Sequence, residues 1–196
     1  MEKKKLIIGG VILGVLVVGG TIFALNKGKS NKQEVTKVET SNKNNNVISE
    51  QNDENKGLSD EELKKKYYLL ENSNISVKDR AEASEVARKF AKDMTEFDIN
   101  DPKKNEAEAL SLVSTDIDKE VQGYFMTLGQ SKEIKEKKIK SIRSEENSNW
   151  GKEYVEVHVY LEYELIDDKN NKTSNGIGYD IRLSKIDGKY KVTSYR

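Results

Sequence analysis

The N-terminal segment constrains this chain more than any other feature of its sequence. Twenty residues without a charge, Leu6 to Leu25, follow the charged start Met1 to Lys5. An α-helix rises about 1.5 Å per residue, so this segment would span about 30 Å, the thickness of the hydrocarbon core of a bilayer. We therefore predict a single transmembrane helix at 6–25, preceded by a short tail at 1–5.

Flanking charges set the expected orientation of this helix. Three lysines, Lys3 to Lys5, favour a cytoplasmic N-terminus, although further lysines on the other flank weaken the asymmetry. We predict that the tail is cytoplasmic and that the rest of the chain is extracytoplasmic, anchored to the cell membrane. The alternative is a cleaved signal peptide, with Val18-Gly19-Gly20 as a small-residue cleavage site.

Two glycines inside the apolar segment, Gly10 and Gly14, form a GxxxG motif. This spacing lets two membrane helices approach closely, so the pair is a candidate helix–helix contact. Glycine is also common in membrane helices for other reasons, and the motif alone is weakly specific.

A polar stretch, 26–57, follows the apolar segment. Its strongly apolar residues are few and have no consistent period: Val35, Val38, Val47 and Ile48. Such a stretch cannot bury enough surface to offset the entropy of ordering it, so we expect a flexible linker. The remaining residues, 58–196, are then one extracytoplasmic domain.

Helical patterns fill the first half of this domain. Ser59 and Glu62 form a capping box before 63–70, and Ser76 can cap a second helix whose apolar stripe runs from Ala83 to Phe97. Asp101-Pro102 is typical of a third helix start, with proline at the first helical position. A further helical turn is expected over 121–126.

After Gly129 the apolar period changes from helical to two. We expect a charged, edge-like strand at 134–144, a strong strand at 154–165, a polar loop at 167–175 and another strand at 177–184. Asp187-Gly188 predicts a two-residue hairpin turn before a last strand that carries Tyr190 and Val192. Helices followed by a meander predict an α+β fold, with helices covering one face of a curved antiparallel sheet.

This order resembles the cone-shaped nuclear transport factor 2-like fold. The resemblance covers roughly Ser76 to Arg196 and depends on the helix at Ala83 to Phe97, the start at Pro102 and the hairpin at Asp187-Gly188. With its anchor and tether, the whole chain resembles the bitopic VirB-type scaffold subunits of type IV secretion and conjugation systems, particularly Gram-positive ones. That resemblance implies a non-enzymatic assembly subunit of a conjugative DNA-transfer channel, with self-association, partners among the other channel subunits and no cofactor.

The residues themselves offer little chemistry. The sequence has no cysteine, which excludes disulfides, thiolate nucleophiles and cysteine-ligated metals. His158 is the only histidine; it could act as a general base, but its strand position predicts an outward-facing surface residue. We therefore expect no catalytic, cofactor-binding or metal-binding residue. The alternatives are a membrane-tethered cone-fold enzyme or small-ligand binder, and a general cell-envelope factor.

Surface aromatics are the candidate contact residues. Trp150, Tyr154 and Tyr160 fall on the outward side of the strand pattern, and exposed aromatics rimmed by charge are typical of protein interfaces. Tyrosines can equally cover neighbouring strands. Formal net charge is zero and the lysine runs at 64–66 and 132–140 lack interleaved aromatics, so we expect neither nucleic acid nor a small-molecule substrate as a partner.

Overall fold

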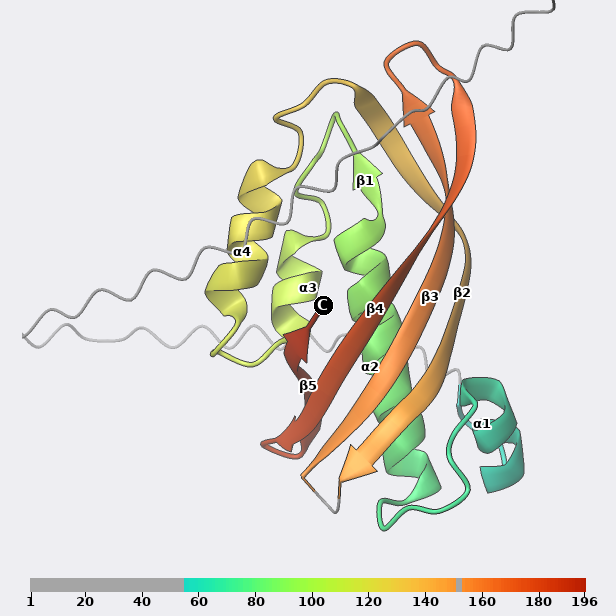
Figure 1. Ribbon diagram of the computed structural model, residues 1–196. Helices are drawn as coiled ribbons and strands as arrows, with labels where there is room; N and C mark the ends of the chain where they lie inside the picture. Colours follow the sequence, from blue (N-terminus) through green and yellow to red (C-terminus); the bar gives the residue numbers. More distant parts are fainter. Residues whose placement is uncertain (1–54, 151–152) are drawn as a thin grey trace, which may run out of the picture. The chain divides into compact units, whose positions relative to one another are not determined.

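The computed structural model describes residues 55–150 and 153–196, and shows helices packed on one face of a five-stranded antiparallel sheet (Figure 1). The elements are α1 (Asp60–Tyr67), α2 (Val77–Thr95), β1 (Phe97–Asp98), α3 (Glu106–Leu112), α4 (Asp118–Thr127), β2 (Ile134–Trp150), β3 (Tyr154–Asp167), β4 (Lys172–Ile186) and β5 (Lys189–Tyr195). The strands lie in sequence order across the sheet. The expected α+β class is confirmed. No helix within the described ranges is long and apolar enough to cross a membrane, and the predicted segment Leu6 to Leu25 lies outside them.

Helix α2 lies against the concave face of the sheet because its inner stripe is made of small residues. Ala83, Ala87 and Ala91 recur every four residues and are completely buried, so the helix backbone can approach the strands closely. Phe90 and Met94 of the same helix fill the space between these contacts. One apolar core therefore occupies the inside of the curved sheet.

The period of two in the strands is confirmed by burial. On β3, Val155, Val157, Val159 and Leu161 are fully buried, whereas the residues between them face the other side. Three register shifts interrupt the pairing of β2 with β3. Each inserts a residue and increases the local twist, which curves the sheet around α2.

The predicted caps and the hairpin turn are also confirmed. Ser59 and Glu62 form a reciprocal capping box at α1, and the Ser76 hydroxyl accepts a hydrogen bond from the Asp79 amide at the start of α2. Asp187 and Gly188 join β4 to β5 with φ angles of 50° and 80°, the left-handed values that such a two-residue turn requires.

Pro102 does not begin a helix, so that prediction was wrong. Residues 101–105 form successive turns, and α3 begins only at Glu106. The Asp98 carboxylate accepts a hydrogen bond from the Asn100 amide, which fixes a turn before the proline. Gly129 lies so close to the Pro102 ring that a Cβ there would be 2.8 Å from its Cγ, so the ring is held by packing against the end of α4.

The strands are longer than predicted. Residues 167–175 do not form a loop: β3 continues to Asp167 and β4 begins at Lys172, with only four residues between them. The Asp167 carboxylate closes this turn by accepting hydrogen bonds from the amides of Lys169 and Asn171. Likewise β2 continues to Trp150 and has β1 and β3 as neighbours, although β1 pairs with only two of its residues. Exposed strand ends lack an apolar alternation, so the period could not reveal them.

Candidate functional site

The outer face of β3 and β4 carries charged side chains in register. Glu156 lies directly opposite Arg182, and His158 lies directly opposite Asp180. Both pairs are therefore set by the strand register, since residues opposite one another on one face of a sheet have neighbouring side chains. We call Glu156, His158, Asp180, Arg182 and Arg196 the outer-face charge cluster.

Glu156 and Arg182 form a two-pronged ion pair. The guanidinium donates from Nη2 at 2.6 Å and from Nε at 3.0 Å to the same carboxylate oxygen. A hydrogen bond from the Ser148 hydroxyl, followed by the Arg182 guanidinium, holds the pKa of the Glu156 carboxyl below its usual value. Arg182 also lies over the ring of Tyr154, with 4.3 Å from Cζ to the ring centroid. The side chain of Arg182 is thus oriented by two neighbours at once.

Asp180 holds the second half of the cluster. Its carboxylate lies 2.8 Å from His158 Nδ1 and accepts a hydrogen bond from Arg196 Nε at 3.1 Å. These two contacts, that of His158 being the larger, lower the pKa of the Asp180 carboxyl. The backbones of Asp180 and Arg196 also exchange two hydrogen bonds, which fix the Arg196 backbone beside β4.

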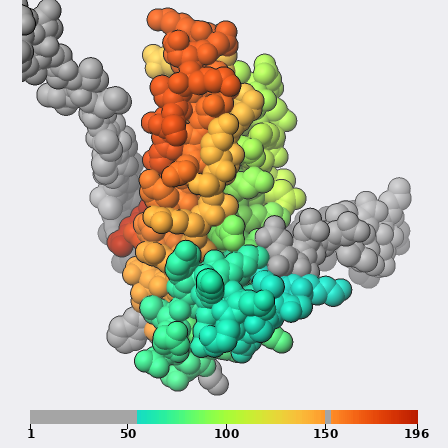
Figure 2. Space-filling view, turned by 90° about the vertical axis from the view of Figure 1, so that its right-hand side faces the viewer, coloured from blue at the N-terminus to red at the C-terminus, as the bar shows by residue number. Residues whose placement is uncertain are grey.

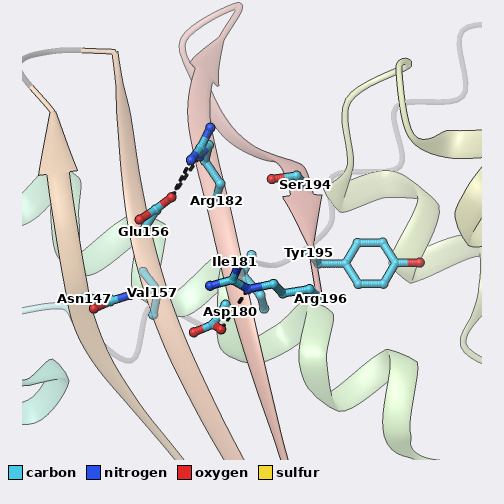
Figure 3. Close-up of a pocket in the computed structure, with 9 residues that line it drawn as sticks. All are labelled: Asn147, Glu156, Val157, Asp180, Ile181, Arg182, Ser194, Tyr195 and Arg196. Carbon is cyan, nitrogen blue, oxygen red and sulfur yellow. Dashed lines mark hydrogen bonds and ion pairs between the residues drawn. The ribbon is translucent and has the colours of Figure 1, made fainter. Parts of the chain in front are cut away.

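A shallow hollow of about 260 Å³ lies beside this cluster (Figure 3). Its polar wall comes from Glu156, Asp180, Arg182 and Arg196, together with Asn147 and Ser194. Figure 3 shows Arg182 turned towards Glu156 and Arg196 turned towards Asp180, whereas the Tyr195 ring points away from them. That ring lies edge-on to Phe90 of the core, at 5.1 Å between centroids.

The charged groups of this cluster neutralise one another. Every charged member of the cluster already has an opposite charge or a hydrogen-bond partner within it. His158 and Asp180 resemble two members of a catalytic triad, but no hydroxyl among the described residues is hydrogen-bonded to the imidazole. The described part of the chain also holds no group of three metal-ligating side chains. What remains is a polar surface with fixed, alternating charges.

The predicted contact residues are placed as follows. Tyr154 and Tyr160 are half-buried on the outer face. Tyr160 lies between two neighbouring strands: Arg143 of β2 lies over its ring at 5.0 Å, and its hydroxyl lies against Gly176 of β4. The side chain of Trp150 and the two glycines Gly10 and Gly14 lie outside the described residues. A role of these residues in contacts stays a prediction.

Sequence reasoning did not identify Arg182, Asp180 and Arg196 as a group. His158 was placed correctly on the outer face, but its partner was not recognised. The signal was present in the alternation of β4, which puts Asp180 and Arg182 on the outward side. The missing information was the β3–β4 register, which follows from the tight turn at 168–171 that was predicted as a longer loop.

Neither a protein-family model nor a curated protein sequence matches this chain. Among solved structures, CagV, a VirB8 homologue of the type IV secretion system of Helicobacter pylori, is similar with a TM-score of 0.43 and 11% identity, over 57% of this chain and 92% of CagV. A protein from Campylobacter jejuni described as an NTF2-like transpeptidase is similar with a TM-score of 0.30 and 13% identity, over 56% of this chain and 95% of that one. These are the two groups that the sequence was expected to resemble. Likenesses of this size carry neither a site nor an activity to this chain.

Proposed function

We propose that this protein is a membrane-anchored, non-enzymatic subunit of a conjugative DNA-transfer channel of the type IV secretion class, and that its domain acts through protein–protein contacts outside the cytoplasmic membrane. The proposed anchor is the apolar segment Leu6 to Leu25, and the proposed tether is 26–57. The kind of assembly comes from the order of anchor, tether and α+β domain along the sequence. Fold-level analogy is the basis of that step.

The observation that carries the non-enzymatic part is the filling of the sheet's concave side. An enzyme with a cone-shaped fold needs polar groups inside the cone, facing a substrate. Here Val155, Val157, Val159 and Leu161 fill the inner side of β3 along most of its length, and the aromatic rings of Phe90 and Phe125 belong to the same buried cluster. The outer-face charge cluster lies on the other side of the sheet, where another protein could reach it.

The test is crosslinking of the full-length protein in its own cells, with mass spectrometry of the products. A channel subunit should yield products with itself and with other membrane subunits of the transfer system. Products with neither, in cells that are transferring DNA, would overturn the proposal. Fractionation of the same cells should place the full-length chain in the membrane and its domain within reach of external protease.

A matched pair of variants extends this test to the outer-face charge cluster. Arg182→Glu reverses a charge within the cluster, whereas Lys189→Glu makes the same change at the exposed β4–β5 turn. We expect Arg182→Glu to lower the yield of crosslinks to channel subunits, with Lys189→Glu close to wild type. Equal effects of both variants would exclude the cluster as a contact surface.

One observation favours the alternative of a small-ligand binder. A second hollow, of about 150 Å³, lies between β1, the end of α4 and β2, and its apolar wall includes Phe97, Leu128 and Ile134. Lys137 also lines it and has no carboxylate partner among the described residues; burial lowers the pKa of its ammonium group. A small carboxylate would supply the missing charge. Titration of the protein with short alkanoates, against a Lys137→Met control, tests this alternative: saturable binding that the substitution abolishes would support it.

A further inference from the structure

Half of strand β4 has no partner on one side. On one side, β4 pairs with β3 from Lys172 to Leu183. On the other side, it pairs with β5 only from Ile181 to Ile186. Residues 172–179 therefore form an open edge, which we call the β4 edge. It belongs to the β3–β4 hairpin, whose tip projects beyond the helices in Figures 1 and 2. Among the described residues, no backbone hydrogen bond reaches this edge from another element.

The pairing with β5 shows which backbone groups are open. Asp180 exchanges two backbone hydrogen bonds with Arg196, so its amide and carbonyl point to the β5 side. Backbone direction alternates along a strand, so the same groups of Lys172, Ser174, Gly176 and Gly178 point outward in the same way. The open edge thus offers four amides and four carbonyls in the spacing of an antiparallel ladder.

The side chains of the β4 edge do nothing to block pairing. From Thr173 to Tyr179 there is no charged residue and no proline, in a protein of which 35% of the residues are charged. The pairing of β3 with β4 shows no register shift, so no bulge turns the edge away. Gly176 and Gly178 are exposed, and a Cβ on Gly176 would lie 2.6 Å from the Tyr160 hydroxyl. Natural sheets protect open edges with lysines, prolines or bulges, and from Thr173 to Tyr179 all three are missing.

The opposite edge of the same sheet is protected. Between the contacts of β2 with β1 and with the segment after α1, four exposed charged residues follow one another: Lys138, Lys140, Arg143 and Glu145. The contact with the segment after α1 then begins at Glu146, whose amide donates to the Tyr68 carbonyl. The β2 edge is therefore protected by charged side chains, whereas the β4 edge has no charged side chain from Thr173 to Tyr179.

We propose that the β4 edge pairs with the β4 edge of a second copy of this chain, to give a sheet that continues across a two-fold axis. Two identical edges in antiparallel alignment satisfy two-fold symmetry, and this edge is self-complementary. An axis at Asn175 places Lys172 opposite Gly178 and Ser174 opposite Gly176, all with open backbone groups. The pairing stops at Gly178 and so leaves Arg196 undisturbed.

Side chains in this register are compatible. Thr173 of one copy lies opposite Ile177 of the other, a pair of β-branched residues, and no two like charges meet. Lys172 lies diagonal to Asp180 of the other copy, where the charges are opposite. From Thr173 to Tyr179 the edge carries no charge, so a second copy of it fits better than a highly charged partner strand would. The inference rests on edge geometry and does not depend on the channel assignment, so its failure would leave the proposed function standing.

The absence of cysteine gives this proposal a direct test. Asn175 is exposed and lies on the proposed axis, so it is opposite itself, at a position whose backbone does not take part in the new ladder. Opposite Cβ atoms at such a position are about 4.5–5.5 Å apart, close enough for a disulfide with small adjustment. Full-length Asn175→Cys, oxidised in its own membranes, should therefore form a covalent dimer. Lys140→Cys, on the charged β2 edge, should stay monomeric at the same expression level.

A second variant separates edge pairing from chance collision. Ser174→Pro removes an outward amide and leaves the ladder between β3 and β4 intact, because that amide does not face β3. Each dimer would lose two hydrogen bonds, and we expect the yield of the Asn175→Cys dimer to fall by about tenfold. If Asn175→Cys reacts with a maleimide but forms no dimer, or if its dimer is unaffected by Ser174→Pro, the proposal is overturned.

Discussion

Arg80 of α2 and Glu146 of β2, which are 66 residues apart in the sequence, form a buried ion pair, with 2.6 Å between Nη1 and Oε2. The Arg80 side chain is 2% exposed and that of Glu146 is completely buried. Both also bind the backbone of Leu70: the guanidinium donates to its carbonyl and the carboxylate accepts from its amide. The pair therefore joins three parts of the domain, the segment after α1, α2 and the sheet.

Removing one member of this pair should be costly because the other charge stays buried. We expect Arg80→Met to lower the free energy of unfolding by about 3–5 kcal/mol. Adding Glu146→Gln removes the orphaned charge and keeps an acceptor for the Leu70 amide, so the double variant should be more stable than Arg80→Met alone. Thermal unfolding followed by circular dichroism measures both. A double variant less stable than the single one would show that the charge is not the cause.

Asp93 predicts a pH dependence of stability. Its carboxyl is buried in α2, one oxygen has no hydrogen-bond partner, and burial raises its pKa to about 6. The folded state then holds this proton more tightly than the unfolded state, so stability falls as the pH rises from about 4 to about 6. Above pH 6 the buried Asp93 carboxyl is charged, and this lowers the free energy of unfolding. Asp93→Asn should therefore stabilise the protein by about 1–3 kcal/mol at pH 7.5. The gain should shrink towards pH 4.5, and a gain independent of pH would contradict this explanation.

Gly176 and Tyr160 should show coupled effects. A methyl group at position 176 would meet the Tyr160 hydroxyl at 2.6 Å and its Cζ at 3.1 Å, so the ring must move. We expect Gly176→Ala to destabilise by about 1–2 kcal/mol. In a Tyr160→Ala background the same substitution should cost little, since nothing is left to displace. Urea unfolding of the four proteins in this double-mutant cycle measures the coupling, and additive effects would disprove the contact.

The cap of α1 should act locally. The Ser59 side chain accepts from the Glu62 amide, while the Glu62 carboxylate accepts from the Ser59 amide at 2.8 Å. Ser59→Ala removes half of this box and should cost about 1 kcal/mol. Because the box holds only α1, hydrogen exchange should become faster at the amides of 60–67 and stay unchanged in β3. Equal acceleration in both elements would mean that α1 and the sheet unfold together.

Sequence reasoning succeeded where the signal is local. The capping residues Ser59 and Ser76, the Asp187-Gly188 turn and the alternation around Val157 are each decided within a few residues, and the structure confirms them. It failed at Pro102, where packing against Gly129 and a turn at Asp98 overrode a common helix signal. The strand residues on both sides of the β3–β4 turn were also missed, because polar strands that project from the core carry no apolar period.

The same difference between local and long-range signals applies to the candidate site. That His158 faces outward could be read from the alternation of one strand. The contacts of Asp180 with His158 and with Arg196 depend instead on the register between strands. The ion pair of Arg80 with Glu146 could not have been predicted in this way, since nothing near either residue marks its partner.

The position of the Arg80–Glu146 pair also decides how the domain would bear mechanical load. A pull on the chain ahead of the domain arrives at Asn55, which is held by hydrogen bonds from the Tyr67 hydroxyl and the Lys66 ammonium group. Tension then passes along the short helix α1 to Leu70, where the buried pair fixes the chain to α2 and β2. Leu63 and Tyr67 of α1 pack in a small core cluster with Ala81 of α2, separate from the main core inside the sheet, so α1 would detach before the main core opens. Under tension from its N-terminal side, α1 would therefore serve as an extensible element in series with a rigid body.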